Sequence, residues 1–285
     1  MNFRAFAIVA LLAATGTLHA AEQEETLTIP DPGSDAIKGD KLSPLVDRSD
    51  PKAINNVGWL WARGTGGVKQ DYTEALNWWK YAAKLGYTPS MNNVGLLYAN
   101  GHGVKQDFDE AFKWWRRAAE RGNAWAMNAI GDLYENGQGV PQNDELALKW
   151  YQEAAAEGDS LAMWNAGHLI EQGKGADRSY AEASKWYLQS ADHGNPLAMT
   201  SMGRVHGDGL GVAANPVEAC AWYTVAALRF TDEYADERAE NQRLLQETAT
   251  RLTPAQRDQA NQRAEELDRK FARPTKGKPN GGDDA

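Results

Sequence analysis

The sequence predicts an all-α fold: a right-handed α-solenoid of five tandem 36-residue helix-turn-helix repeats with a C-terminal helical cap. Three sets of residues recur with this one period. Two are glycine ladders and one is a tryptophan ladder, and their members are Gly95, Gly131, Gly167 and Gly203, then Gly86, Gly122, Gly158 and Gly194, then Trp114, Trp150, Trp186 and Trp222. A period of this length indicates stacked helical units, each of which buries its face against its neighbours.

The chain begins with a segment typical of a secretory signal, residues 1–20. Arg4 supplies a positive start, Phe6 to Ala14 form a short apolar run, and small residues follow near Ala20. The run is too short to span a bilayer, so a cleaved signal is favoured over an anchor. We therefore expect the mature protein to be periplasmic or secreted.

Composition limits the kinds of partner and of covalent cross-link that the chain can have. The 285 residues carry a net charge of -9, which argues against nucleic-acid binding, and Cys220 is the only cysteine, so no intramolecular disulfide can form. No second apolar run of spanning length occurs, so we expect no stable membrane insertion after signal removal. Residues 21–51, which are acidic and contain prolines, and residues 273–285 are predicted to be flexible tethers.

The second repeat illustrates how each unit folds. Residues 90–100 place apolar side chains at helical spacing, and Gly95 on the same side lets a neighbouring helix approach closely. Two glycines in the segment 101–107 predict a tight turn, and Asp107 is an N-cap candidate for the next helix, residues 108–121. That helix alternates tryptophan with alanine, which favours interlocking helices.

The repeats cover residues 52–230, because a first copy fits once one extra glycine is allowed in the turn at 64–67. Residues 231–272 are predicted to cap the array with two amphipathic helices. Thr253-Pro254-Ala255-Gln256 forms a capping box with proline at the first helical position, which indicates where the second cap helix begins.

The run G-x-x-Y-x-x-G-x-G-V-x-x-D-x-x-E-A-x-x-W-W-x-x-A-A-x-x-G, from Gly95 to Gly122, resembles the Sel-one-like repeat, a relative of the tetratricopeptide repeat. Similar runs start at the equivalent glycine of every unit. The resemblance implies that helix pairs stack into a solenoid whose inner, concave side can hold a peptide. The sequence departs from the pattern at Ile170, Ala176, His206, Pro216 and Val217.

The pattern predicts no catalytic residue, no metal site and no cofactor. The chain lacks H-E-x-x-H, G-x-S-x-G and a phosphate-binding loop. The repeated Gly-x-Gly segments follow helices rather than strands, so they are read as turns. Cys220 occupies an interior helix position and is expected to be buried and unreactive. The aromatic ladders are expected to pack in the core rather than bind sugars.

The best candidates for binding are residues of the first helix of each repeat that face the concave side. Asparagines at a fixed period could clamp the main chain of an extended peptide, because an amide side chain both donates and accepts hydrogen bonds. The predicted peptide- or protein-binding residues are Asn55, Trp59, Asn92, Asn93, Leu96, Trp125, Asn128, Asp132, Trp164, Asn165, His168 and Arg204.

These candidates are not equivalent. Asn56, Asn93 and Asn165 belong to the common pattern of the repeat, so a structural role and a binding role both remain open. Asn55, Asn92 and Asn128 are better ligand candidates because packing is not expected to require them. Trp125 and Trp164 have no tryptophan at the equivalent positions of other repeats, which favours a role as binding hot spots.

Two function classes follow from this pattern. The preferred one is a non-enzymatic exported protein-protein interaction module that binds an unidentified protein or peptide in the cell envelope, as an adaptor, a signalling regulator or a toxin-neutralising protein. The alternative is a weak cell-wall or β-lactam hydrolase, as described for cysteine-rich exported relatives of this repeat, although this chain has a single cysteine. A scaffold without a peptide groove lies between the two.

Overall fold

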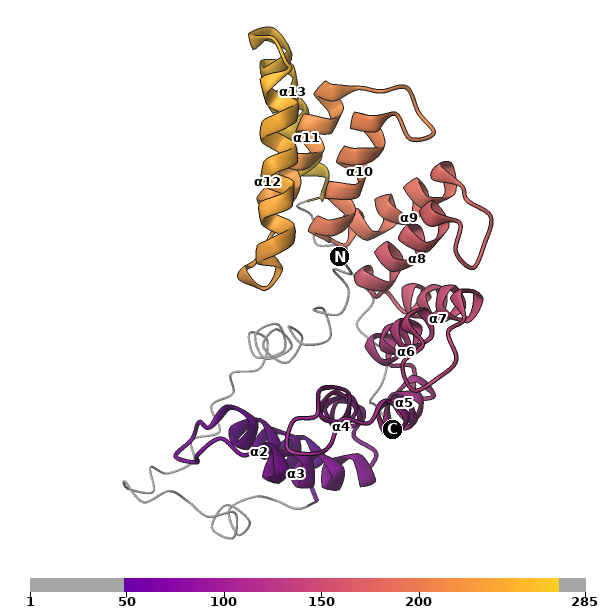
Figure 1. Cartoon of the computed structure of the whole chain (residues 1–285). Helices are drawn as coiled ribbons and strands as arrows, with labels where there is room; N and C mark the ends of the chain where they lie inside the picture. The colour runs from indigo at the N-terminus through magenta and orange to yellow at the C-terminus, as the bar shows by residue number, and fades with distance from the viewer. Residues whose placement is uncertain (1–48, 272–285) are drawn as a thin grey trace. The chain divides into compact units, whose positions relative to one another are not determined.

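The computed structural model describes residues 49–271, which hold 12 α-helices and no strand (Figure 1). The predicted signal, nearly all of segment 21–51 and the tail 273–285 lie outside the described residues. The all-helical fold predicted from the sequence is confirmed. The helices are α2 (Pro51–Arg63), α3 (Tyr72–Lys84), α4 (Thr88–Asn100), α5 (Phe108–Ala119), α6 (Ala124–Asn136), α7 (Asp144–Ala156), α8 (Ser160–Gln172), α9 (Tyr180–Asp192), α10 (Pro196–Asp208), α11 (Pro216–Ala227), α12 (Ala235–Thr250) and α13 (Pro254–Phe271), with a 3-10 turn, η3 (Asp232–Tyr234).

The described chain divides into two compact units between Asn143 and Asp144. Unit 1 contains α2 to α6, and unit 2 contains α7 to α13. Within each unit, successive helices of the repeats pack against one another, as the solenoid prediction requires. The third repeat is divided by this boundary, since α6 belongs to unit 1 and α7 to unit 2.

The turn between the two helices of a repeat has the predicted form. In the second repeat Gly101 adopts the left-handed conformation, with φ of 70°, and its N–H donates to the carbonyl of Leu97. The Asp107 side chain accepts a 3.0 Å hydrogen bond from the N–H of Glu110, so the predicted N-cap is confirmed. Helix α5 ends at Ala119, two residues before the predicted end, because the chain turns there toward Gly122, whose φ is 79°.

A glycine inside the first helix of the first, second, fourth and fifth repeats permits contact with an aromatic ring of the second helix. A Cβ atom added to Gly95 would lie 2.2 Å from Nε1 of Trp115, and one added to Gly58 would lie 2.3 Å from Nε1 of Trp79. No real Cβ atom tolerates such a distance. The close approach predicted from the glycine ladder is therefore confirmed in these repeats.

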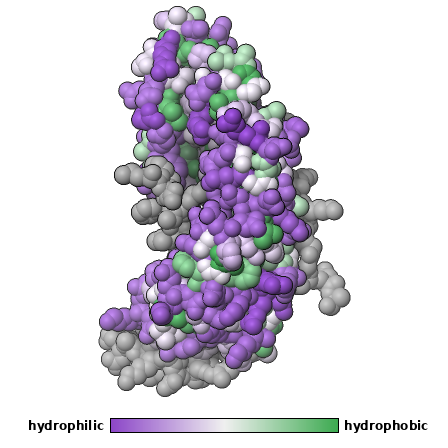
Figure 2. All heavy atoms as spheres, turned by 45° about the vertical axis from the view of Figure 1, so that its right-hand side comes forward, coloured by the Kyte–Doolittle hydropathy of each residue, from purple (hydrophilic) through white to green (hydrophobic). Residues whose placement is uncertain are grey.

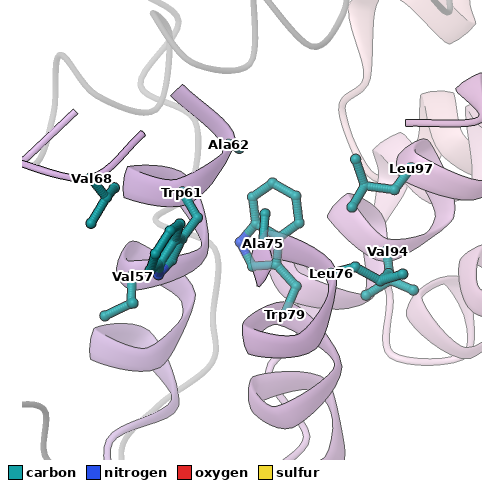
Figure 3. Close-up of a cluster of buried hydrophobic side chains, with 9 residues drawn as sticks. All are labelled: Val57, Trp61, Ala62, Val68, Ala75, Leu76, Trp79, Val94 and Leu97. Atoms are coloured by element: carbon teal, nitrogen blue, oxygen red, sulfur yellow. The ribbon is translucent and has the colours of Figure 1, made fainter. Parts of the chain in front are cut away.

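The core of unit 1 forms around the tryptophans that contact these glycines, Trp79 and Trp115. Trp79 is fully buried and packs with Val57, Leu76 and Val94 (Figure 3). Figure 3 shows Leu76 of α3 beside Val94 of α4, so α3 contributes to packing on both of its sides. The aromatic row one residue further along each B helix, Trp79, Trp115, Tyr151, Tyr187 and Tyr223, is buried throughout, as the core interpretation predicted. Of the tryptophan ladder itself only Trp222 is buried. The core prediction is therefore wrong for the partly exposed Trp78, Trp114, Trp150 and Trp186.

The two cap helices are present, and both pack on α11. The predicted capping box is complete: the N–H of Gln256 donates to Oγ1 of Thr253 at 3.3 Å, and the N–H of Thr253 donates to Oε1 of Gln256 at 3.0 Å. Phe271 at the end of α13 lies 5.3 Å from Trp222, measured between ring centres. The cap therefore covers the apolar face of the last repeat.

Candidate binding surface on the A helices

The first helix of each repeat, here called an A helix, is α2, α4, α6, α8 or α10, and the second, here called a B helix, is α3, α5, α7, α9 or α11. The five glycines of the A helices are conserved among the repeats, whereas the residue after each glycine changes. That position holds Trp59, Leu96, Asp132, His168 and Arg204. Four of these five side chains are partly exposed, and Leu96 is buried.

Asn55 does not lie on an open surface. It is 5% exposed, and its Oδ1 accepts hydrogen bonds from Oγ of Ser90 at 2.9 Å and from Nδ2 of Asn93 at 3.1 Å. The expectation that packing does not require Asn55 is therefore wrong. Asn93 ties α4 to α2 through this contact, which gives that asparagine a structural role.

Leu96 and Asn128 also lie inside the structure. Leu96 is 1% exposed and Asn128 is 3% exposed, so the expectation that both side chains are accessible on the concave side is wrong. An A helix has neighbours on more than one side, and a position beside the glycine can therefore turn into the core. Asn165 in unit 2 is likewise buried.

Trp59 of unit 1 stays partly exposed and is held in place by two contacts. Its ring meets the ring of Trp79 edge-on, with centres 5.1 Å apart, and the Arg63 guanidinium lies 5.0 Å from its centre. The ring is therefore positioned before any partner arrives. A rigid aromatic with an accessible face loses little conformational entropy on binding.

Asn92 and Trp125 lie close together in unit 1, and each has an unused polar atom. Nδ2 of Asn92 donates to Oδ1 of Asn123 at 2.9 Å, and Asn123 caps α6, so the orientation of the Asn92 amide is determined. The ring of Trp125 lies 5.7 Å from that of Trp115, whose Nε1 donates to the Asn92 carbonyl. Oδ1 of Asn92 and Nε1 of Trp125 are buried and have no hydrogen-bond partner among the described residues.

Trp164 and His168 form the corresponding aromatic surface of unit 2. Their rings are stacked, with centres 5.3 Å apart and planes inclined by 12°. Nε1 of Trp164 donates to Oγ of Ser201 at 2.9 Å, which links α8 to α10. Both side chains remain partly exposed, so this pair offers a fixed aromatic face on the A helices.

Arg204 belongs to a polar network around Glu171. Its Nη2 donates to Oε1 of Glu171 at 2.9 Å, and the Tyr187 hydroxyl donates to the other carboxylate oxygen. Burial and the adjacent Glu171 carboxylate raise the pKa of Tyr187 well above its usual range. The Glu171 side chain is 11% exposed, so the network anchors Arg204 while leaving it partly accessible.

The Ser201 side chain also hydrogen-bonds to Tyr187. Sequence reasoning missed Glu171, Tyr187 and Ser201 as members of this network, although a signal was available. Glutamate occurs four residues after the A-helix glycine only at Glu135 and Glu171. In both repeats the ring residue of the B helix is tyrosine, at Tyr151 and Tyr187, where the first two repeats have tryptophan. A hydroxyl that replaces an indole N–H needs a different acceptor, and a glutamate provides one.

Cys220 lies in an apolar environment that does not favour a reactive thiol. Cys220 is buried against Leu252 and Ala260, as predicted, and burial raises the pKa of its thiol. No group of three or more histidine, cysteine or acidic side chains that could hold a metal ion occurs between residues 49 and 271.

Stacked helix pairs, glycine-to-ring contacts and glycine-rich turns define an α-solenoid of the tetratricopeptide-like class. The Sel1 repeat model matches five consecutive segments, residues 51–87, 88–123, 126–159, 160–195 and 196–229. These matches cover more than half of the chain, and the protein belongs to the Sel1 repeat family. Repeats of this family act mainly as non-catalytic protein-interaction modules.

Solved structures agree with this assignment. The chain is similar to c5321, a protective antigen of uropathogenic Escherichia coli with an SLR fold, at 29% identity and a TM-score of 0.62 over 81% of this chain. It spans about half of that protein, 47%. It is also similar to a Sel1 repeat protein from Oxalobacter formigenes, at 27% identity and a TM-score of 0.60, over 82% of this chain and 88% of that one. No curated protein matches the chain as a relative.

Proposed function

We propose that the chain is an exported, non-enzymatic interaction module that binds a protein or peptide in the cell envelope through the exposed side chains of its A helices. The observation that carries this proposal is the change of residue after the A-helix glycine. The glycines and rings that build the fold recur in every repeat, whereas this position holds four different partly exposed residues. A position that the fold leaves variable is available for recognition.

The surface of unit 1 offers both parts of a peptide-recognition site. Trp59 supplies an accessible ring, while Oδ1 of Asn92 and Nε1 of Trp125 lack partners. A buried polar atom without a hydrogen bond costs about 1–3 kcal/mol. The N–H and C=O groups of a bound peptide could satisfy the acceptor and the donor after small side-chain movements, so binding would recover part of that cost.

Unit 2 offers a different chemistry on its own A helices. Trp164 and His168 provide a stacked aromatic face, and Arg204 provides a positive charge held by Glu171. We propose that this surface recognises an aromatic or acidic side chain of the partner. Export of the protein, with cleavage near Ala20, is part of the proposal and rests on the sequence of residues 1–20.

The test is selection of binding peptides from a random displayed library, followed by affinity measurement on single variants. Trp59→Phe, Trp125→Phe and Trp164→Phe each keep an aromatic ring but remove the indole N–H, and at least one is expected to weaken binding about tenfold. Trp186→Phe is the matched control, because Trp186 is a partly exposed ring on a B helix. Failure to select any peptide, or a larger loss in Trp186→Phe, would contradict the proposal.

A further inference from the structure

The ends of the B helices in unit 1 carry an excess of positive charge that the proposed peptide surface does not use. The C-terminal half of α3 and its following turn contain two cations, and the same part of α5 contains three cations and one acid. We name this set the basic end surface, and its cations are Lys80, Lys84, Arg116, Arg117 and Arg121. The ends of α3 and α5 lie on one side of unit 1, because α4 packs between these helices and their tryptophans, Trp78 and Trp114, contact one hydrophobic cluster.

The equivalent positions in unit 2 have the opposite charge. The end of α7 and its turn carry Glu153, Glu157 and Asp159 without a cation, and the end of α9 carries Asp192. The fold therefore does not require cations at these positions. Arg229, at the end of α11, is paired with Asp268 at 2.7 Å.

Most of the charge on the basic end surface is accessible. Lys84, Arg117 and Arg121 are exposed, and none of the three forms an ion pair within residues 49–271. Arg116 forms an exposed pair with Glu120 at 3.2 Å, and Lys80 donates to the Tyr98 hydroxyl at 2.8 Å. Three cations therefore remain for an external anion.

Apolar and aromatic side chains accompany these cations. Leu85 is 46% exposed and Tyr81 is 37% exposed, and they are two of the five large hydrophobic residues that are exposed in the described chain. The Arg117 guanidinium lies 4.8 Å from the centre of the partly exposed Trp114 ring. The face presented in Figure 2 is mostly hydrophilic. Leu85 and Tyr81 add exposed apolar surface to the same helix end as the unpaired Lys84.

We propose that the basic end surface docks on an anionic phospholipid bilayer. Exposed lysines and arginines attract negative headgroups, and tyrosine, tryptophan and leucine beside them can enter the interfacial layer. A bilayer meets cations from two helix ends without needing a shaped pocket, whereas an acidic protein would need a matching contour. No described helix is long and apolar enough to cross a membrane, so the contact is peripheral.

The experiment measures binding of the purified protein to vesicles at low ionic strength. One set contains phosphatidylcholine alone, and the other contains three parts phosphatidylcholine to one part phosphatidylglycerol. The test variant combines Lys84→Gln, Arg117→Gln and Arg121→Gln. The control combines Lys149→Gln, Lys185→Gln and Arg269→Gln, three exposed residues of unit 2 whose replacement changes the net charge equally. Helicity of each variant is compared with the wild type by circular dichroism.

We expect the wild type to bind the anionic vesicles only. Each exposed cation contributes about fivefold in affinity, so the test variant, which lacks three of them, should bind on the order of 100-fold more weakly. The control should bind within about twofold of the wild type. Equal binding to both vesicle types, absence of binding to the anionic vesicles, or an equal loss in the control would overturn the proposal. Binding to soluble polyglutamate without binding to vesicles would overturn it in favour of an acidic polypeptide partner.

Discussion

In both units an aromatic ring of a B helix packs on an A-helix glycine, but the ring and its hydrogen-bond partner differ between the units. In unit 1 the ring that covers the A-helix glycine is tryptophan, and Nε1 of Trp79 and Trp115 donates to main-chain carbonyls at 3.0 and 3.3 Å. In unit 2 the ring is tyrosine, and the Tyr187 hydroxyl donates to the Glu171 side chain. The comparison teaches that the glycine determines how closely the helices approach, whereas the polar partner of the ring can change.

The change of ring has an electrostatic consequence. An indole N–H does not titrate in the accessible pH range, and a main-chain carbonyl carries no net charge. The tyrosine version instead places an ionisable hydroxyl and a carboxylate in the core, with Arg204 beside them. Unit 2 should therefore respond to pH and to loss of single polar groups in ways that the tryptophan contacts of unit 1 do not.

The largest expected effect comes from filling the space at the glycine. Gly95→Ala should lower the free energy of unfolding by about 3 kcal/mol, because its Cβ would lie 2.2 Å from the Trp115 ring. Gly167→Ala should cost only about 1 kcal/mol, since its closest contact is 2.8 Å, to Cε1 of Tyr187, and alanine favours helices. Urea unfolding followed by circular dichroism measures both, and equal costs would contradict the account.

A smaller loss should follow removal of the carboxylate in unit 2. Glu171→Ala leaves the Tyr187 hydroxyl without its acceptor and Arg204 without its partner, and should destabilise the protein by about 2 kcal/mol. If the network acts as a unit, the double variant Glu171→Ala and Tyr187→Phe should cost less than the sum of the single variants. Additive costs in this double-mutant cycle would show that the two residues are independent.

Alkaline pH should lower the free energy of unfolding because two buried tyrosines have raised pKa values in the folded protein. Burial raises the pKa of Tyr223 to about 12, and the pKa of Tyr187 lies above the usual range. Because the unfolded chain releases these protons near pH 10 while the folded chain keeps them, stability is fully present below pH 10 and falls as the pH rises above it. Tyr187→Phe should flatten that decline in unfolding measurements between pH 9 and 11, and an unchanged slope would exclude Tyr187 as a source.

The smallest effect in this series concerns a turn. Gly122 has a positive φ of 79°, but no atom lies within 4 Å of an added Cβ. Gly122→Ala should therefore cost about 1 kcal/mol, from backbone strain alone. A cost as large as that of Gly95→Ala would contradict the account, in which ring contact makes a glycine harder to replace than a positive φ does.

Much of the fold could be predicted because periodic residues report on the backbone. Gly101, Asp107 and the capping box at Thr253 act locally, so their roles follow from the neighbouring sequence. The direction in which a side chain points does not follow from the neighbouring sequence when its helix is packed on several sides. Asn55 and Leu96 occupy positions that the repeat pattern places on the concave face, yet both turn into contacts with adjacent helices.

The binding surface was predictable only in part for the same reason. The partly exposed positions Trp59, Trp125 and Trp164 could be selected because they differ among repeats. The network of Glu171, Tyr187 and Ser201 joins three helices through side chains, and a single repeat does not reveal it. The joint appearance of tyrosine and glutamate in the third and fourth repeats, Tyr151 with Glu135 and Tyr187 with Glu171, was the signal that could have identified it.

The most direct test of the central claim is photo-crosslinking of a selected peptide to the protein. A photoreactive phenylalanine derivative is placed at position 59 or 164 on the A helices, and in separate variants at position 78 or 186 on the B helices. The account predicts crosslinked peptide from at least one A-helix position and none from the B-helix positions. Crosslinking from positions 78 or 186 alone would contradict the A-helix binding surface.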